Sequence, residues 1–113
     1  MARIVKETVA ETKTCQWYDG LGLQRLKLNG FGRRGFPDQE FFVPGGKPFL
    51  IEFKADGEEP RKLQAYIHKQ LKEAGYDIEV HTNHLEAIAA IKRRLEAVSS
   101  VRADKATKRV RKA

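Results

Sequence analysis

The sequence is poor in the residues and motifs of several common protein classes. Cys15 is the single cysteine among 113 residues, so no disulfide bond can form within the chain. No apolar run approaches the roughly 20 residues of a membrane-spanning helix, and no secretory leader is recognisable. The motifs CxxC, HExxH, GxxxxGKS/T and GxSxG are also missing. We therefore expect a cytoplasmic protein that lacks the signatures of zinc proteases, P-loop enzymes and serine hydrolases.

Positive charge is what the sequence has in excess. The formal net charge is +7, which favours nucleic acid as a partner and an anionic membrane as the second candidate. Residues 102–113 contain six bases and one acid and carry +5 of that charge. This segment either binds phosphates, through residues such as Arg109 and Arg111, or is a solvated terminus. We accordingly divide the chain into a domain over residues 1–101 and a flexible basic tail over 102–113.

Hydrophobic spacing predicts seven elements in the order α-β-β-β-α-β-α. A hydrophobic share of 41% supports one domain with a modest core. Helices are predicted over residues 3–18, from 58–60 to Gly75, and from Asn83 through Val98. Strands are predicted around residues 23–28, 41–43, 49–53 and 78–80. The expected fold is an α/β sandwich with a small mixed sheet flanked by helices.

The loop Pro44–Gly46 sets the register of the central hairpin. A three-residue loop whose last glycine is left-handed pairs Val43 with Lys47. Counting back along both strands then sets Asp38 opposite Glu52. A two-residue loop would shift the register by one residue and turn Asp38 to the other face of the sheet.

Three charged residues in this apolar hairpin point to a chemical role. Glu52 and Lys54 share one face of their strand, and in the register above Asp38 joins them. Two neighbouring carboxylates repel unless a cation lies between them, and oxygen ligands suit Mg²⁺ or Mn²⁺. The Phe53 carbonyl is a further candidate ligand, and Lys54 could orient a water or neutralise charge on a phosphate. The pattern indicates metal-assisted phosphodiester hydrolysis, the alternative being an exposed Glu52–Lys54 pair worth about 1 kcal/mol at most.

These motifs resemble a known family when their order is considered. The stretches G-F-P-D (35–38) and I-E-F-K (51–54), the helix with Leu63-Gln64, and Gly75 resemble the VRR-NUC branch of the PD-(D/E)xK nucleases. The resemblance covers residues 5–98 and is to the minimal, stand-alone form, whose members are often phage-encoded. It implies a restriction-endonuclease-like fold and a bacterial or phage-infected host cytoplasm.

The resemblance also implies roles for individual residues. Asp38 and Glu52 become metal ligands, Lys54 becomes catalytic, and Gln64 takes a supporting polar role. The family places a glutamate on the first helix, where both Glu7 and Glu11 are candidates. We prefer Glu7 because it lies about 15 residues before Gly22, the spacing expected to the glycine that ends the helix.

Several further side chains are candidates for contact with DNA. Arg33 and Arg34 lie in a glycine-rich loop just before the expected site, and Lys27 precedes that loop. Tyr66 and Trp17 could stack on bases, although we expect both to pack in the core. The spacing of the three histidines matches no zinc pattern, which favours surface or supporting roles. These are His68, His81 and His84.

The sequence thus predicts a structure-specific DNA endonuclease that depends on Mg²⁺ or Mn²⁺. A homodimer would present two active sites, which suits symmetric cleavage of a four-way (Holliday) junction. The first or the last helix could supply the interface. The alternatives are a flap or nicking nuclease of DNA repair and a non-catalytic DNA-binding module that uses the basic tail.

Overall fold

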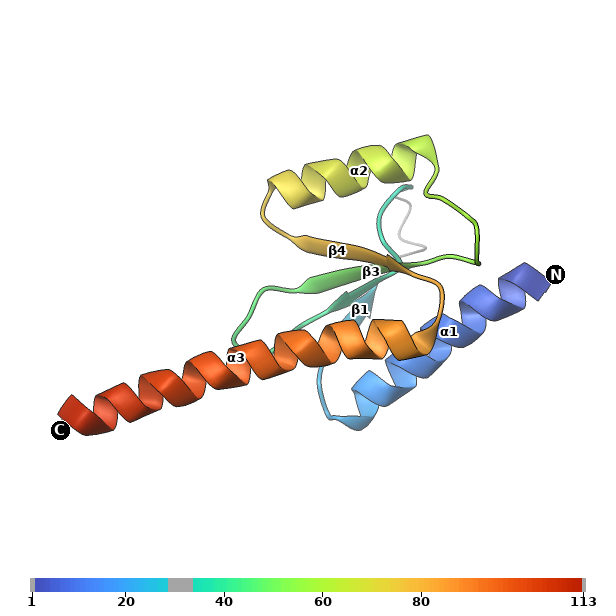
Figure 1. Ribbon diagram of the computed structural model, residues 1–113. Coiled ribbons are helices and arrows are strands. Elements are labelled where there is room, and N and C mark those ends of the chain that lie inside the picture. The colour runs from blue at the N-terminus through green and yellow to red at the C-terminus, as the bar shows by residue number, and fades with distance from the viewer. Residues whose placement is uncertain (1, 29–33, 113) are drawn as a thin grey trace.

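A four-stranded mixed sheet with helices on both faces forms the body of the protein in a computed structural model (Figure 1). The structure describes the backbone of residues 2–28 and 34–112, and the side chains of residues 8–28 and 34–99. The elements are α1 (Ala2–Gly20), β1 (Arg25–Lys27), β2 (Gln39–Phe41), β3 (Phe49–Phe53), α2 (Lys62–Glu73), β4 (Asp77–His81) and α3 (His84–Lys112). This order confirms the predicted α-β-β-β-α-β-α arrangement.

The strands follow their sequence order across the sheet, β1-β2-β3-β4. The first three are antiparallel to their neighbours, whereas β3 and β4 run parallel and are connected through α2. Two parallel strands need such a crossover, because the chain must return to the starting end of the sheet before the second strand begins. Helix α2 lies on one face of the sheet, and α1 and α3 lie on the other (Figure 1). All five residues of β3 are buried as a result.

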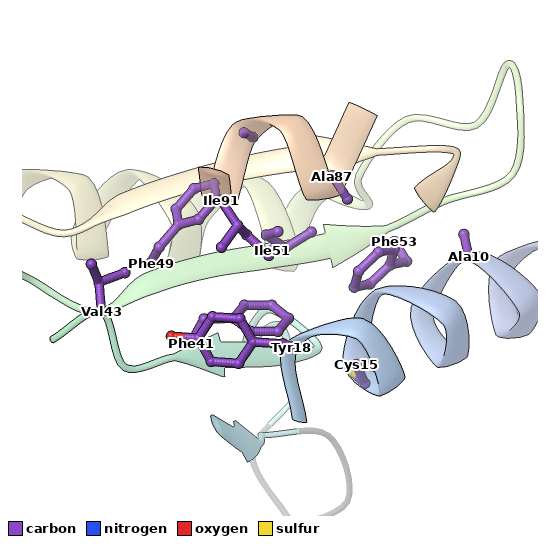
Figure 2. Packing of buried hydrophobic residues seen from close by; sticks show 11 residues of the cluster. Ala10, Cys15, Tyr18, Phe41, Val43, Phe49, Ile51, Phe53, Ala87 and Ile91 are labelled. Atoms are coloured by element: carbon purple, nitrogen blue, oxygen red, sulfur yellow. The ribbon is translucent and has the colours of Figure 1, made fainter. Parts of the chain in front are cut away.

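The main core lies between the sheet and the α1–α3 layer (Figure 2). Tyr18 and Phe41 are fully buried, with ring centroids 4.9 Å apart and planes near perpendicular. The Tyr18 hydroxyl donates a hydrogen bond of 2.7 Å to the Phe42 carbonyl, so its polar end is satisfied. Three residues of β3 on the face opposite Glu52 are members of this core. They are Phe49, Ile51 and Phe53.

The hairpin has the predicted register but a different turn. Phe41 pairs with Phe49 and Gln39 with Ile51, the offset that was expected. The turn is closed by a hydrogen bond of 2.9 Å from the Gly46 amide to the Val43 carbonyl. Gly45, with φ of 77°, is the left-handed residue, so the expectation of a left-handed Gly46 was wrong. Proline followed by a left-handed glycine is the signature of a type II turn.

Strand β2 and helix α2 also differ from their predicted bounds. Strand β2 spans 39–41 rather than 41–43, because its ladder runs back through polar Gln39 and Glu40, which hydrophobicity does not mark. Helix α2 begins at Lys62, not at residues 58–60. Arg61 is extended, with ψ of 163°, and its amide donates a 2.9 Å hydrogen bond to the Gln64 side chain. The predicted helix-ending Gly75 is confirmed by its φ of 100°.

Helix α2 buries a polar side chain against the sheet and leaves a large aromatic one exposed. Tyr66 is 57% exposed, so the expectation that it packs in the core was wrong. Its hydroxyl accepts a hydrogen bond of 2.9 Å from Gln70 on the helix surface. The helix buries His68 instead, because the sheet face below it carries the charged Glu52. Trp17, in contrast, packs against the core as expected.

Strand β4 is an edge strand that α3 holds through an ionic network. Arg94 of α3 lies 2.7 Å from the Glu79 carboxylate and 3.5 Å from Asp77. The other Glu79 oxygen lies 2.8 Å from the ring of His81. The Arg94 guanidinium also stacks on Phe49, 3.5 Å from the ring centroid. His81 therefore has a structural partner within the fold.

Helix α3 starts directly after Asn83 and runs far beyond the sheet. The Glu86 amide donates a 2.9 Å hydrogen bond to the Asn83 side chain, which caps the start of the helix. No glycine or proline follows, and the helix continues through the basic segment to Lys112 (Figure 1). The flexibility of that segment stays a prediction. No helix in the described part of the chain has the length and apolarity needed to cross a bilayer.

Gly35 and Gly57 provide a matched test of how closely α2 packs on the segment before Asp38. Both are left-handed, but a Cβ on Gly35 would lie 2.9 Å from Ile67, whereas Gly57 has open space. We expect Gly57→Ala to cost about 1 kcal/mol for the backbone conformation alone. Gly35→Ala should cost a further 1–3 kcal/mol or so, because α2 must shift. Urea unfolding measures both, and equal losses would contradict the close packing.

Candidate active site

Two buried carboxyl groups meet at the carboxyl end of β3. Glu52 lies on β3 and is 3% exposed, and Asp38 lies just before β2 and is 8% exposed. The Asp38 carboxylate accepts a hydrogen bond of 2.8 Å from the Phe53 amide, and the Asp38 amide donates one of 3.1 Å to Ile51. Both bonds fix Asp38 against β3, beside Glu52. The structure thus brings together the two acids that were predicted from the sequence to lie side by side.

Lys54 completes the arrangement from the next position on the same face. Its ammonium nitrogen lies 3.6 Å from Glu52 Oε2, and the two side chains are 12% and 4% exposed. The Lys54 amide donates a 3.0 Å hydrogen bond to the His81 carbonyl, which holds this residue beside β4. An exposed surface pair is excluded by this burial. A buried lysine beside two acids is a candidate for stabilising charge on a reacting group.

Burial and proximity disturb the ionisation of both acids. Desolvation raises the pKa of Glu52 to about 8, with the charge of Asp38 acting in the same direction and Lys54 opposing it. Desolvation also raises the pKa of Asp38, against the hydrogen bond from Phe53. Two carboxylates this close cannot both ionise cheaply without a cation. Between them the pair retains a proton near neutral pH when no cation is bound.

Helix α2 supplies two polar side chains that face Glu52. Gln64 Nε2 lies 3.5 Å from Glu52 Oε2, and its carbonyl oxygen caps the start of the helix at Arg61. His68 Nε2 lies 3.9 Å from Glu52 Oε1 and is also buried. The sequence predicted Gln64 as a site residue and gave His68 only a surface or supporting role. The spacing of four residues, which places both on one helix face, is the signal that could have found it.

Glu11 occupies a neighbouring position on α1. Its carboxylate accepts a 2.7 Å hydrogen bond from Gln39, whose own oxygen accepts one of 3.2 Å from Arg25. Glu11 is thus engaged beside the acid pair, and its charge adds to the rise in the pKa of Asp38. Glu7 lies one turn earlier on the same helix face, about 6 Å along the axis. Its side chain lies outside the described residues, so its role stays a prediction.

The residues predicted to contact DNA are spread over the molecule. Arg34 and Lys27 are exposed, near the hairpin and on β1 respectively. Arg33 lies outside the described residues. Arg109 and Arg111 lie on the distal part of α3, whose side chains are not described, and this part projects from the end of the sheet opposite the carboxyl end of β3 (Figure 1). The structure does not bring the basic tail to the acid pair of its own chain.

The donor set at the acid pair fits a hard divalent cation. Asp38 and Glu52 offer carboxylate oxygens, and Glu52 Oε1 is buried with no hydrogen-bond partner in the described part of the chain. An orphaned, buried carboxylate oxygen is costly unless an ion or donor meets it. Within residues 8–28 and 34–99, no three His, Cys, Asp or Glu side chains form a metal cluster. The Phe53 carbonyl and Glu7 stay predicted ligands.

Fold and site together define a class of protein, the restriction-endonuclease-like nucleases. The fold matches a solved VRR-NUC domain with a TM-score of 0.63, over 80% of this chain and 95% of that one, at 23% sequence identity. No family model matches the sequence. The chain is, however, 32% identical over 76 residues to "Putative nuclease p44" of Acyrthosiphon pisum secondary endosymbiont phage 1. The matched segment covers 67% of this chain and 82% of that protein. The chain therefore belongs to a family of VRR-NUC-like, phage-associated nucleases.

The raised pKa of Glu52 predicts a pH-dependent penalty to folding. An acid with a higher pKa in the folded state loses stability as pH rises from about 4.5 to about 8, because folding then opposes its ionisation. Glu52→Gln removes that ionisation. In EDTA it should exceed the wild type in free energy of unfolding by roughly 2–4 kcal/mol at pH 8 and by little at pH 4.5.

Urea unfolding at the two pH values measures the difference. Glu59→Gln, at an exposed acid outside the site, is the matched control and should show no such pH dependence. A constant difference between wild type and Glu52→Gln across this pH range would contradict the disturbed acid pair.

Proposed function

We propose that the chain is an endonuclease that hydrolyses phosphodiester bonds in branched DNA with Mg²⁺ or Mn²⁺. The observation that carries this proposal is the buried pair Asp38 and Glu52, with the Lys54 amine 3.6 Å from Glu52. A buried charge cluster of this kind is costly to fold and tends to mark a functional site. Family membership supports the same reading, since the phage relative is named as a nuclease.

Each residue of the site has a distinct role in this proposal. Asp38 and Glu52 would hold the cation, with the Phe53 carbonyl and Glu7 as further ligands. A cation held there would polarise the phosphate and lower the pKa of a water. Lys54 would orient the attacking water and neutralise the charge that develops on the phosphate oxygens. Gln64, whose amide lies 3.5 Å from Glu52 Oε2, holds the Glu52 carboxylate in place.

The basic residues suggest recognition of DNA shape rather than of sequence. Arg34 and Lys27 are exposed, and Arg33 precedes Arg34 in the sequence. Arginine and lysine contacts to phosphates position a protein without reading bases. We propose a homodimer, whose two sites would cut a four-way junction symmetrically. Arg109 and Arg111, far from the site of their own chain, would contact DNA arms away from the cut.

Cleavage of a labelled four-way junction tests the proposal directly. The wild type should cut in Mn²⁺ and not in EDTA. Lys54→Met keeps the apolar stem of the side chain and removes its charge, and it should lower the cleavage rate at least about 100-fold. Asp38→Asn and Glu52→Gln should do the same, while junction binding in EDTA remains within a few-fold of the wild type.

Lys69→Met, at an exposed lysine on α2, is the matched control and should cut at the parental rate. Paired symmetric cuts support a dimeric resolvase, and preferred cutting of a flap or nicked duplex supports the repair alternative. Salt-sensitive binding with no cleavage of any substrate in Mn²⁺ or Mg²⁺ would refute the nuclease and leave a binding module.

The basic segment makes a separate prediction about affinity. Replacing Arg109 and Arg111 together by glutamine should weaken junction binding and reduce the slope of log Kd against log salt by about 2. Replacing both by lysine preserves the charge and should preserve the slope. Fluorescence anisotropy over a salt series measures both variants. An unchanged slope in the glutamine variant would assign this segment to solubility rather than to DNA contact.

A further inference from the structure

Helix α2 presents two polar side chains to the two oxygens of Glu52. Gln64 and His68 are four residues apart and therefore lie on one face of the helix. Gln64 Nε2 is 3.5 Å from Oε2, and His68 Nε2 is 3.9 Å from Oε1. The Glu52 carboxylate thus has one potential donor from α2 at each oxygen. The capping bond between Gln64 and the Arg61 amide fixes the start of the helix that carries both.

The contact between His68 and Glu52 is buried and incompletely formed. The two side chains are 8% and 4% exposed. Glu52 Oε1 and His68 Nε2 both lack a hydrogen-bond partner among the residues that the structure describes. Two buried polar atoms left unpaired destabilise the fold, which favours a second state of the protein in which the two atoms are paired. A shift of about 1 Å would bring them to hydrogen-bond distance.

The position of His68 argues against direct contact with DNA. Its ring is covered by the helix that carries it and by the sheet face below, and little of its surface reaches solvent. The charged groups that face it are Glu52, Lys54 and, from its own helix, Lys72. A buried donor beside a carboxylate acts on that carboxylate rather than on a substrate. Partners of this kind orient metal ligands and influence how tightly the ion is held.

We propose that His68 is a positioning residue, which donates its Nε2 hydrogen to Glu52 Oε1 and, together with Gln64, fixes the carboxylate for cation binding. The inference rests on one part of the proposed function, the binding of a cation by Glu52, and not on the cleavage of DNA. It extends that function by placing a second residue of α2 in the site. Helix α2 would then hold Glu52 from one side while Asp38 approaches it from the hairpin.

Binding of Mn²⁺ without DNA provides a readout that does not depend on cleavage. Electron paramagnetic resonance of free Mn²⁺ measures its affinity for the protein. His68→Ala should weaken Mn²⁺ binding about 10-fold or more, the usual effect of losing such a partner. His68→Gln keeps an amide hydrogen at the reach of Nε2, and its affinity should stay within about 3-fold of the wild type. His68→Asn places its amide nearer the backbone, at the position of Nδ1, and should resemble His68→Ala.

The comparison of Gln with Asn keeps the test decisive if the alanine variant fails to fold. Both are polar amides, so packing alone predicts similar Mn²⁺ affinities for them. His84→Ala, at the start of α3, is the matched histidine control and should bind Mn²⁺ as the wild type does. Thermal unfolding in EDTA confirms that each variant is folded. Parental affinity in His68→Ala, or equal losses in the Gln and Asn variants, would overturn the proposal.

Junction cleavage by the same proteins separates this inference from the proposed function. If the wild type cuts and the His68 variants bind Mn²⁺ and cut like it, only the positioning role falls. If the wild type binds Mn²⁺ but cuts no DNA, the nuclease proposal falls and the affinities still decide the role of His68. A wild type that binds no Mn²⁺ overturns both.

Discussion

The constraint on which the rest of this structure depends is the burial of two acids beside each other. Asp38 lies just before β2 and Glu52 lies on β3, and neither is held in place by its own segment alone. The hairpin register, the bond from the Phe53 amide and the nearby Lys54 amine are all needed to place them. Such an arrangement destabilises the fold in the absence of a cation. The apolar core on the opposite face of β3 offsets that cost.

The two faces of β3 therefore differ in chemistry, one being apolar and the other charged. One face packs aromatic and aliphatic side chains against α1 and α3, which makes the strand rigid. The other face carries Glu52 and Lys54 toward α2, which places the polar side chains of Gln64 and His68 against Glu52. A site on a central, fully buried strand is held more precisely than one on a loop. This division also explains why α2 exposes Leu63 and Tyr66 while burying a histidine.

Local signals in the sequence were sufficient for the element order, the hairpin register and the two acids. Proline and glycine mark the hairpin turn, and strand alternation then aligns Asp38 with Glu52. The bounds of β2 were missed because Gln39 is polar yet buried by its bond to Glu11, a contact 28 residues away in sequence. The role of His68 was left open for a similar reason. The four-residue spacing places His68 on the same helix face as Gln64, but the partner that gives both a role, Glu52, lies on another element.

The ionic network along β4 limits how two copies of this chain can associate. Edge strands invite pairing with another chain, and charged side chains discourage it. Asp77, Glu79 and His81 alternate along β4, and Arg94 holds the two acids from α3. Joining two sheets at this edge would strip water from Asp77, whose side chain is 65% exposed. Pairing of two copies through the β4 edge is therefore unfavourable.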